Sequence, residues 1–257
     1  MYFIKIIITI MLIITSLQGV EMEKIKTVWD NIELYWKKFD KKLALREGDT
    51  QKDIIEFEKR YNVIFPEELV YSLKRNYQNS RRGRKALTYP WFGSNIGIDL
   101  LSTNEIKKSY EFYKKYSNLE DTKLPNVSTV FIGDIYYDKV TKWRDKWIPI
   151  VHNDEIDIVL FIDLDRTSKN YQKVIGLYDT YLDGVGDHFR FALIANNYLE
   201  FISDLENNFF EYQKQNNNKM EVTDENGFDT YYLEKKFQLP KGFWTNEYRE
   251  KMIEKRR

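Results

Sequence analysis

The stretch WIPIVHNDEIDIVLFIDLD, residues 147–165, decides the fold class. Two short runs rich in β-branched and aromatic residues, 147–151 and 156–162, stand on either side of a polar segment. Such runs are typical of strands, and the pair Asn153 and Asp154 between them is typical of a turn. This stretch therefore predicts a β-hairpin.

Similar runs extend the pattern in both directions, at residues 127–137, 173–178 and 189–195, each separated from the next by polar turns. We therefore expect an antiparallel sheet after residue 125. Helical spacing of apolar residues precedes the sheet at 23–40, 50–61, 66–77 and 106–116, and follows it at 197–212. Helices, then strands, then a helix predict an α+β fold, with a mostly antiparallel sheet and packed helices.

The composition excludes several classes of function. The chain has 257 residues, 42% of them hydrophobic, which is enough apolar material for a folded domain. Forty Lys and Arg balance 40 Asp and Glu, so the total charge does not favour direct nucleic-acid binding. The absence of Cys and the presence of only 2 His argue against disulfides, thiol catalysis and zinc fingers. We expect no metal and no cofactor.

The two ends of the chain differ from the middle. Residues 1–21 combine an early Lys5 with an apolar stretch, which is typical of a signal peptide or hydrophobic anchor. The alternative is that translation starts at Met22. The first interpretation predicts an exported or membrane-anchored protein, with membrane contact only through an uncleaved leader, and the second predicts a cytoplasmic one. Residues 213–227 are Asn-rich and predict a linker to an aromatic and charged C-terminal extension, 228–257.

Several stretches in one order resemble the SUKH superfamily, which includes the Smi/Knr-type cell-wall assembly regulator. They are Trp29 with Ile32; 53–58 (DIIEFE) and 63–69 (VIFPEEL); 100–106 (LLSTNEI); and 147–150 (WIPI), 160–165 (LFIDLD), 172–175 (QKVI), 191–192 (FA) and the helix through Leu199, Phe201 and Leu205. The sequence departs from the family at residues 77–79, which lack Gly, and at 165–173, which lack Pro and Gly. The resemblance implies one SUKH-like domain over residues 23–212.

The resemblance also implies a function. Bacterial members of the superfamily act mainly as immunity proteins that bind and neutralise a cognate toxin, whereas fungal members serve as interaction scaffolds, and no catalytic set is associated with the family. We therefore expect a non-enzymatic domain that binds a protein, such as a nuclease-type toxin. The alternative within this class is a regulatory scaffold in cell-envelope assembly.

An enzymatic alternative comes from the sequence DLDRT, residues 163–167, which follows an apolar run. Magnesium-dependent phosphatases of the haloacid-dehalogenase type place a nucleophilic Asp and a general acid two residues later in this way. In this alternative, Asp163 and Asp165 are the catalytic pair. That fold requires parallel strands with crossover helices, and here only short strands and one helix follow the motif.

Acidic turn residues and two tryptophans are the candidates for partner binding. Asp154, Glu155, Asp163 and Asp165 fall in predicted turns, and several such residues on one rim of the sheet would complement a basic nuclease surface. Trp91 and Trp143 are flanked by Pro90 or by cations, which favours an exposed anchor over a core position.

Overall fold

A computed structural model describes residues 6, 19–34, 47–75, 87–88, 97–116, 128–137, 143–153, 158–179 and 188–215. Most of the predicted leader and linker, and the whole C-terminal extension, lie outside these ranges. Among the helices that these residues form, none combines the length and apolar character needed to cross a membrane.

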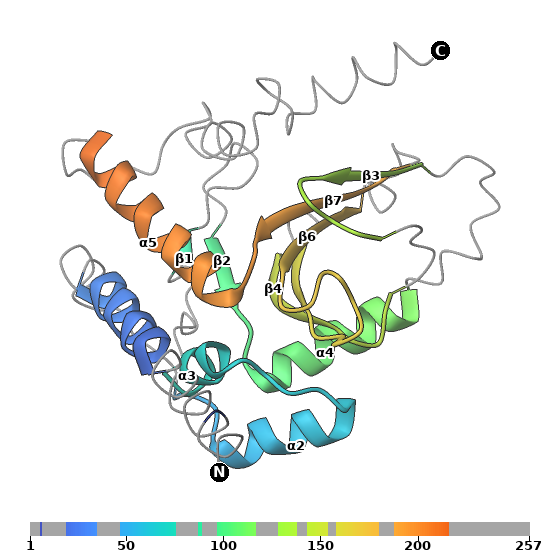
Figure 1. The fold of residues 1–257 in the computed structure, drawn as a ribbon, viewed down its shortest axis with the longest axis horizontal. Coiled ribbons are helices and arrows are strands. Elements are labelled where there is room, and N and C mark those ends of the chain that lie inside the picture. The colour runs from blue at the N-terminus through green and yellow to red at the C-terminus, as the bar shows by residue number, and fades with distance from the viewer. Residues whose placement is uncertain are drawn as a thin grey trace.

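A seven-stranded sheet forms the centre of the molecule (Figure 1). Every pair of neighbouring strands is antiparallel except β3 and β7, which are parallel. The prediction of an α+β fold with a mostly antiparallel sheet is therefore confirmed. In spatial order, the strands are β1 (Leu87–Thr88), β2 (Gly97–Leu100), β4 (Trp147–Asn153), β5 (Ile158–Asp163), β6 (Val174–Asp179), β7 (His188–Ala195) and β3 (Ser128–Ile132).

Strand β5 forms the middle of the core. Four consecutive side chains, Val159, Leu160, Phe161 and Ile162, are almost completely buried, although successive side chains of a strand point to opposite faces. Both faces of β5 are therefore covered, which explains why its sequence is a continuous apolar run without alternation. Phe161 stacks on Trp147 of the neighbouring β4, with ring centroids 4.5 Å apart.

Four helices have defined bounds, α2 (Gln51–Tyr61), α3 (Glu67–Arg75), α4 (Thr103–Tyr116) and α5 (Tyr198–Gln215). Helix α4 packs against β4 and contacts α2, while α5 contacts β7 and α3. Thr50 begins α2 with a capping box, in which its side chain accepts from the Asp53 N–H and the Asp53 carboxylate accepts from the Thr50 N–H. Ser102 and Glu105 exchange the same pair of bonds at the start of α4, as their spacing predicts.

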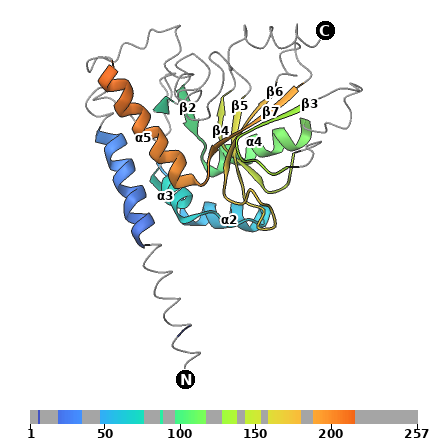
Figure 2. The ribbon, with the colours of Figure 1, turned by 45° about the horizontal axis from the view of Figure 1, so that its top comes forward.

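Residues 19–34 are also helical, and they run beside α5 (Figure 2). The Trp29 indole is fully buried and donates a hydrogen bond to the Ser72 hydroxyl of α3 at 2.7 Å. Arg75, at the end of α3, forms ion pairs with Asp30 at 2.5 Å and with Glu33 at 2.6 Å. This segment is therefore an integral part of the folded domain.

Lys146, just before β4, joins the sheet to the end of α2. Its ammonium group donates hydrogen bonds to the carbonyl oxygens of Tyr61, at 2.8 Å, and of Asn62. These carbonyls lie at the C-terminus of α2, where the helix dipole favours a positive charge. Lys146 thus completes the end of a helix that lies about 85 residues earlier in the chain.

Three features of the sheet differ from the sequence prediction. Strands β1 and β2 were not predicted, because two and four residues are too few to show a strand period. The run predicted at 127–137 contributes only β3, which ends before Gly133. Gly133 has φ +82°, and a Cβ atom there would lie 2.9 Å from the Leu193 Cβ, so the strand stops where the chain turns tightly against β7.

Gly48 allows the chain to approach the end of α3 closely. The Asp49 N–H donates to the Leu73 carbonyl at 2.9 Å, and a Cβ atom on Gly48 would lie 1.6 Å from the Lys74 carbonyl oxygen. We expect Gly48→Ala to lower the free energy of unfolding by about 3 kcal/mol, because the helix end must move away. Urea denaturation measures the effect.

The matched control is Gly19→Ala. Gly19 is helical and exposed, and a Cβ atom there would meet nothing within 4 Å. Alanine has the higher helix propensity, so this change should be neutral or stabilising by up to about 1 kcal/mol. Equal unfolding midpoints for the two variants would contradict the close approach at Gly48.

Candidate functional site

The Asp163 carboxylate is the centre of a hydrogen-bond network at the end of β5. Its side chain is only 1% exposed. One carboxylate oxygen, Oδ2, accepts from the Tyr137 hydroxyl at 2.6 Å and from the Ser168 hydroxyl at 2.8 Å. The other, Oδ1, accepts from the Asp165 N–H at 2.9 Å. Both oxygens of this buried acid are therefore occupied by donors from the chain itself.

The same network closes the β5–β6 turn, residues 164–173, on itself. The Gln172 N–H donates to the Asp163 carbonyl at 2.6 Å, with Gln172 in the left-handed region at φ 67°. Asp165 Oδ1 accepts from the Thr167 N–H at 2.9 Å and from its hydroxyl at 2.7 Å. These two bonds to Thr167 hold the pKa of Asp165 below its ordinary value. The turn is thus held by its own polar groups.

Two adjacent tyrosines connect this turn to the segment after β3. Tyr137 is buried, and burial together with the nearby Asp163 charge raises the pKa of its hydroxyl far above the ordinary value. Tyr136 points outward and is 55% exposed. Its backbone N–H donates to the buried Asn170 Oδ1 at 3.0 Å. The ammonium of Lys173 lies 4.6 Å from the Tyr136 ring centroid, and that of Lys169 lies 6.0 Å away.

This geometry gives Asp163 a structural role. A nucleophilic carboxylate needs a free oxygen directed at its substrate, whereas both Asp163 oxygens accept internal bonds. Strand β5 is antiparallel to both of its neighbours, unlike the strands of the phosphatase fold considered above. In the described ranges, no group of three or more His, Cys, Asp or Glu side chains is arranged to hold a metal ion.

The structure describes only part of the predicted acidic rim. Trp91, Asp154 and Glu155 lie outside the described residues. Asn153 and Ile158, which flank the two acids, pair with each other at the end of β5 opposite to Asp163. Successive hairpins of an antiparallel sheet turn at alternating ends, so the β4–β5 connection and the β5–β6 turn cannot share a rim. Asp163 is also buried, and only Asp165 of this pair is partly exposed.

Trp143 is a core residue, which corrects the expectation of an exposed anchor. Its side chain is 5% exposed and stacks on Tyr113 of α4, with ring centroids 5.0 Å apart. The indole N–H donates to the Trp147 carbonyl at 3.1 Å. The prediction rested on the flanking cations. Arg144 is indeed exposed, whereas the adjacent Trp143 side chain points inward.

The exposed side chains of this site were missed in the sequence. Tyr136 lies more than 30 residues before Lys169 and Lys173, and no short-range spacing links its ring to these two cations. They meet because β3 pairs with β7 and the chain then returns across the β5–β6 turn. Only the position of β3 in the sheet, which the sequence pattern did not indicate, brings them together.

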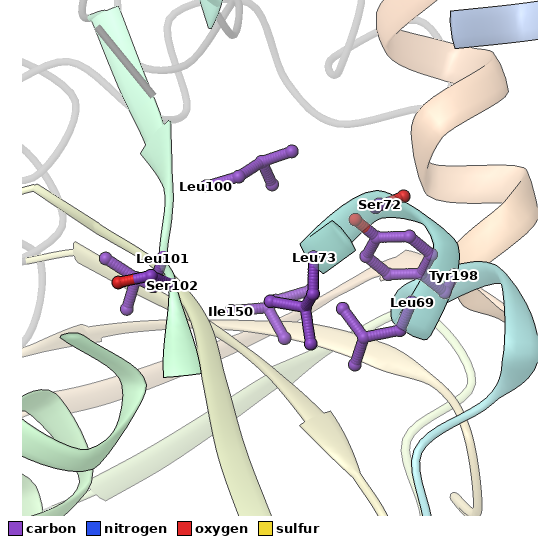
Figure 3. A pocket seen from close by; sticks show the side chains of 8 residues that line it. All are labelled: Leu69, Ser72, Leu73, Leu100, Leu101, Ser102, Ile150 and Tyr198. Carbon is purple, nitrogen blue, oxygen red and sulfur yellow. The ribbon is translucent and has the colours of Figure 1, made fainter. Parts of the chain in front are cut away.

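A hollow between α3, β4 and the start of α5 is the second candidate (Figure 3). It is lined by Leu69, Leu73, Leu100, Leu101 and Ile150 together with the hydroxyl-bearing Ser72, Ser102 and Tyr198. Ser72 Oγ donates to the Glu68 carbonyl, and Ser102 Oγ donates to the Glu105 carboxylate. Burial raises the pKa of Tyr198. The hydroxyls of Ser72 and Ser102 therefore both donate to acceptors within the chain.

The comparison with protein families agrees with this arrangement of elements. The model of the SMI1 / KNR4 family (SUKH-1) matches residues 48–204. The chain belongs to this family. The matched range of the SUKH-1 domain runs from just before α2 into α5, and so contains both the Asp163 network and the hollow. Among curated proteins, none matches the sequence.

The helical residues 19–34 precede the matched SUKH-1 range, although Ile25, Val28, Trp29 and Ile32 belong to its core. The structure therefore extends the folded unit toward the predicted start at residue 23. The resemblance identified from the sequence stretches is confirmed by the family match.

Removal of the Tyr137 hydroxyl tests the Asp163 network. Tyr137→Phe leaves a buried carboxylate with one donor fewer, so we expect the free energy of unfolding to fall by about 2 kcal/mol. The matched control, Tyr136→Phe, removes the same atom from the exposed neighbour and should change stability by less than about 0.5 kcal/mol. Similar unfolding curves for both variants would show that the bond to Asp163 contributes little.

The half-buried Glu68 provides a test by pH. Burial raises the pKa of Glu68 above its ordinary value of 4.5. A raised pKa stabilises the fold when the group is protonated, and this contribution is lost as the pH rises through the folded pKa. The stability of Glu68→Gln relative to wild type should therefore rise from about pH 4 to pH 7.

The control for this test is Glu67→Gln, which removes one negative charge from the same turn of α3 at an exposed position. This control measures the loss of the favourable interaction between a negative charge and the helix N-terminus, which both substitutions cause. Chemical denaturation at several pH values gives the comparison. A stability difference between Glu68→Gln and wild type that stays constant over the range would contradict the effect of burial.

Proposed function

We propose that this SUKH-1 protein is a non-enzymatic, protein-binding domain of the immunity type, which binds a cognate bacterial toxin and neutralises it. Family membership supports the first part, because SUKH proteins are commonly protein-binding. The second part, neutralisation of a toxin, follows the role that the superfamily resemblance implies for bacterial members.

The observation that carries the proposal is the internal use of the Asp163 carboxylate. The DxDxT motif at residues 163–167 is the sharpest catalytic signal in the sequence. In the fold its first acid binds the Tyr137 and Ser168 hydroxyls, and its second acid binds Thr167. The motif therefore serves to build a turn. A rigid turn that holds the exposed ring of Tyr136 on the adjacent segment suits recognition of another protein, since tyrosines frequently anchor interfaces.

Co-expression tests this function directly. The product of each gene adjacent to that of this protein is expressed in a bacterial host, alone and together with this chain. We expect one product to arrest growth, and co-expression to restore growth by forming a one-to-one complex that light scattering detects after gel filtration. Failure of every neighbouring product to bind would contradict immunity and favour a scaffold in envelope assembly.

A parallel assay tests the non-enzymatic part of the proposal. The purified protein is incubated with Mg²⁺ and p-nitrophenyl phosphate, and we expect no turnover above the buffer. Phosphatase activity that disappears in Asp165→Asn, a substitution at a partly exposed position, would overturn the proposal.

A further inference from the structure

We propose that the β5–β6 turn and the adjoining segments bind an acidic face of a protein partner. The contact surface, called here the Tyr136 surface, consists of Tyr136, Arg144, Arg166, Lys169 and Lys173. This inference rests on the proposed function in one respect, namely that the physiological occupant is a protein. It reverses the charge that the acidic residues of the sequence had suggested.

The described residues at this end of the sheet carry more cations than acids. The described segments 133–137, 143–146 and 163–173 carry five cations, Arg144, Lys146, Arg166, Lys169 and Lys173, and four acids, Asp134, Asp145, Asp163 and Asp165. Asp163 is buried, Asp145 lies 3.2 Å from the ammonium of Lys114 on α4, and the Lys146 ammonium donates to carbonyls at the end of α2. A positive charge therefore remains on this surface, although the formal charge of the whole chain is zero. Such a surface complements a negative surface of a partner.

Tyr136 is suited to be the anchor of the contact. Its ring is more than half exposed, while its backbone is held by Asn170, a residue that is 0% exposed. The ammonium of Lys173 stays near the ring and also donates to the Asp134 carbonyl, which limits its motion. An aromatic ring and cations that are already positioned lose little conformational entropy on binding, so more of the contact energy appears as affinity.

The Asp163 network supplies the rigidity behind this surface. The Asp163 carboxylate holds the middle of the turn through the Ser168 hydroxyl. The end of the turn is held by the Gln172 N–H, which donates to the Asp163 carbonyl. On the other flank, the Arg144 guanidinium lies 4.6 Å from the Tyr137 ring centroid, and its charge helps to lower the pKa of Asp165. The basic side chains on both flanks are therefore arranged around one buried carboxylate.

The arrangement favours a protein over a nucleic acid. Proteins that bind single strands combine a continuous positive groove with several aromatic rings on which bases stack. Here Asp134 and Asp165 interrupt the cations, and each would repel a phosphate. In the described parts of these segments, Tyr136 is the aromatic ring that is exposed. Alternating charges with a positive excess match the acidic and mixed surfaces of proteins better than a uniform phosphate backbone.

A titration with a decaglutamate peptide tests the surface without knowledge of the partner. The full-length protein is labelled with ¹⁵N, and amide chemical shifts are followed by NMR at low salt. We expect shifts concentrated in residues 134–137, 144–146 and 165–173, which disappear at 0.5 M NaCl because exposed charges are then screened. Absence of shifts, or shifts concentrated elsewhere, would overturn the proposal.

Charge-reversal variants identify the side chains responsible. The double variant Lys169→Glu with Lys173→Glu should weaken decaglutamate binding at least tenfold. The matched control, Lys24→Glu with Lys52→Glu, makes the same change in total charge at exposed helical positions elsewhere and should retain binding. Equal weakening by both pairs would show a response to total charge only, and would overturn the assignment. Unfolding curves establish that the variants are folded.

Two further arms separate the possible outcomes. A decathymidylate that shifts the same amides at lower concentration than decaglutamate would overturn the choice of a protein occupant. A neighbouring gene product that binds the wild type, but binds Lys169→Glu/Lys173→Glu with unchanged affinity, would refute the Tyr136 surface and leave the proposed function intact. A tenfold loss of that affinity, together with a lower association rate, would support both.

Discussion

Burial of the Asp163 charge is the constraint on which the functional end of this fold depends. A carboxylate removed from water costs several kcal/mol unless donors replace its hydration. Here the replacements come from the segment after β3, through Tyr137, and from the β5–β6 turn, through Ser168 and the Asp165 amide. Two parts of the chain that lie side by side only in the folded state are therefore fixed by one acid, and the exposed Tyr136 follows from the inward position of its neighbour.

The strongest local patterns of the sequence predicted the centre of the fold well. The β4 to β7 meander was expected from its apolar runs, since buried strands need little beyond continuous β-branched and aromatic residues. The capping boxes at Thr50 and Ser102 are similarly local, because they rest on contacts three residues apart. Strands β1 and β2 and the parallel position of β3 were not predicted, because short strands near the edges of a sheet depend on pairing with distant partners.

The site was predicted less well than the fold, for a related reason. Composition and turn propensity predicted that acids lie in the turns between strands. They did not predict at which edge of the sheet each turn lies, because that depends on the direction of each strand. Trp143 shows the same limitation on a smaller scale, since flanking cations cannot tell which of two adjacent side chains points inward. DxDxT was recognised as a motif, whereas its role depends on Tyr137, which lies 26 residues before Asp163.

The parallel pairing of β3 has a consequence for biosynthesis. Ser128 pairs with His188, 60 positions later, so β3 leaves the ribosome well before the strand that it needs. At typical elongation rates of 5–20 residues per second, about 3 to 12 seconds separate the two. During this interval the apolar sequence STVFI has no β7 beside it, and the nascent chain is then most open to chaperones and to aggregation. The last strand of the meander thus completes the sheet by docking onto a strand that emerged before the rest of the meander.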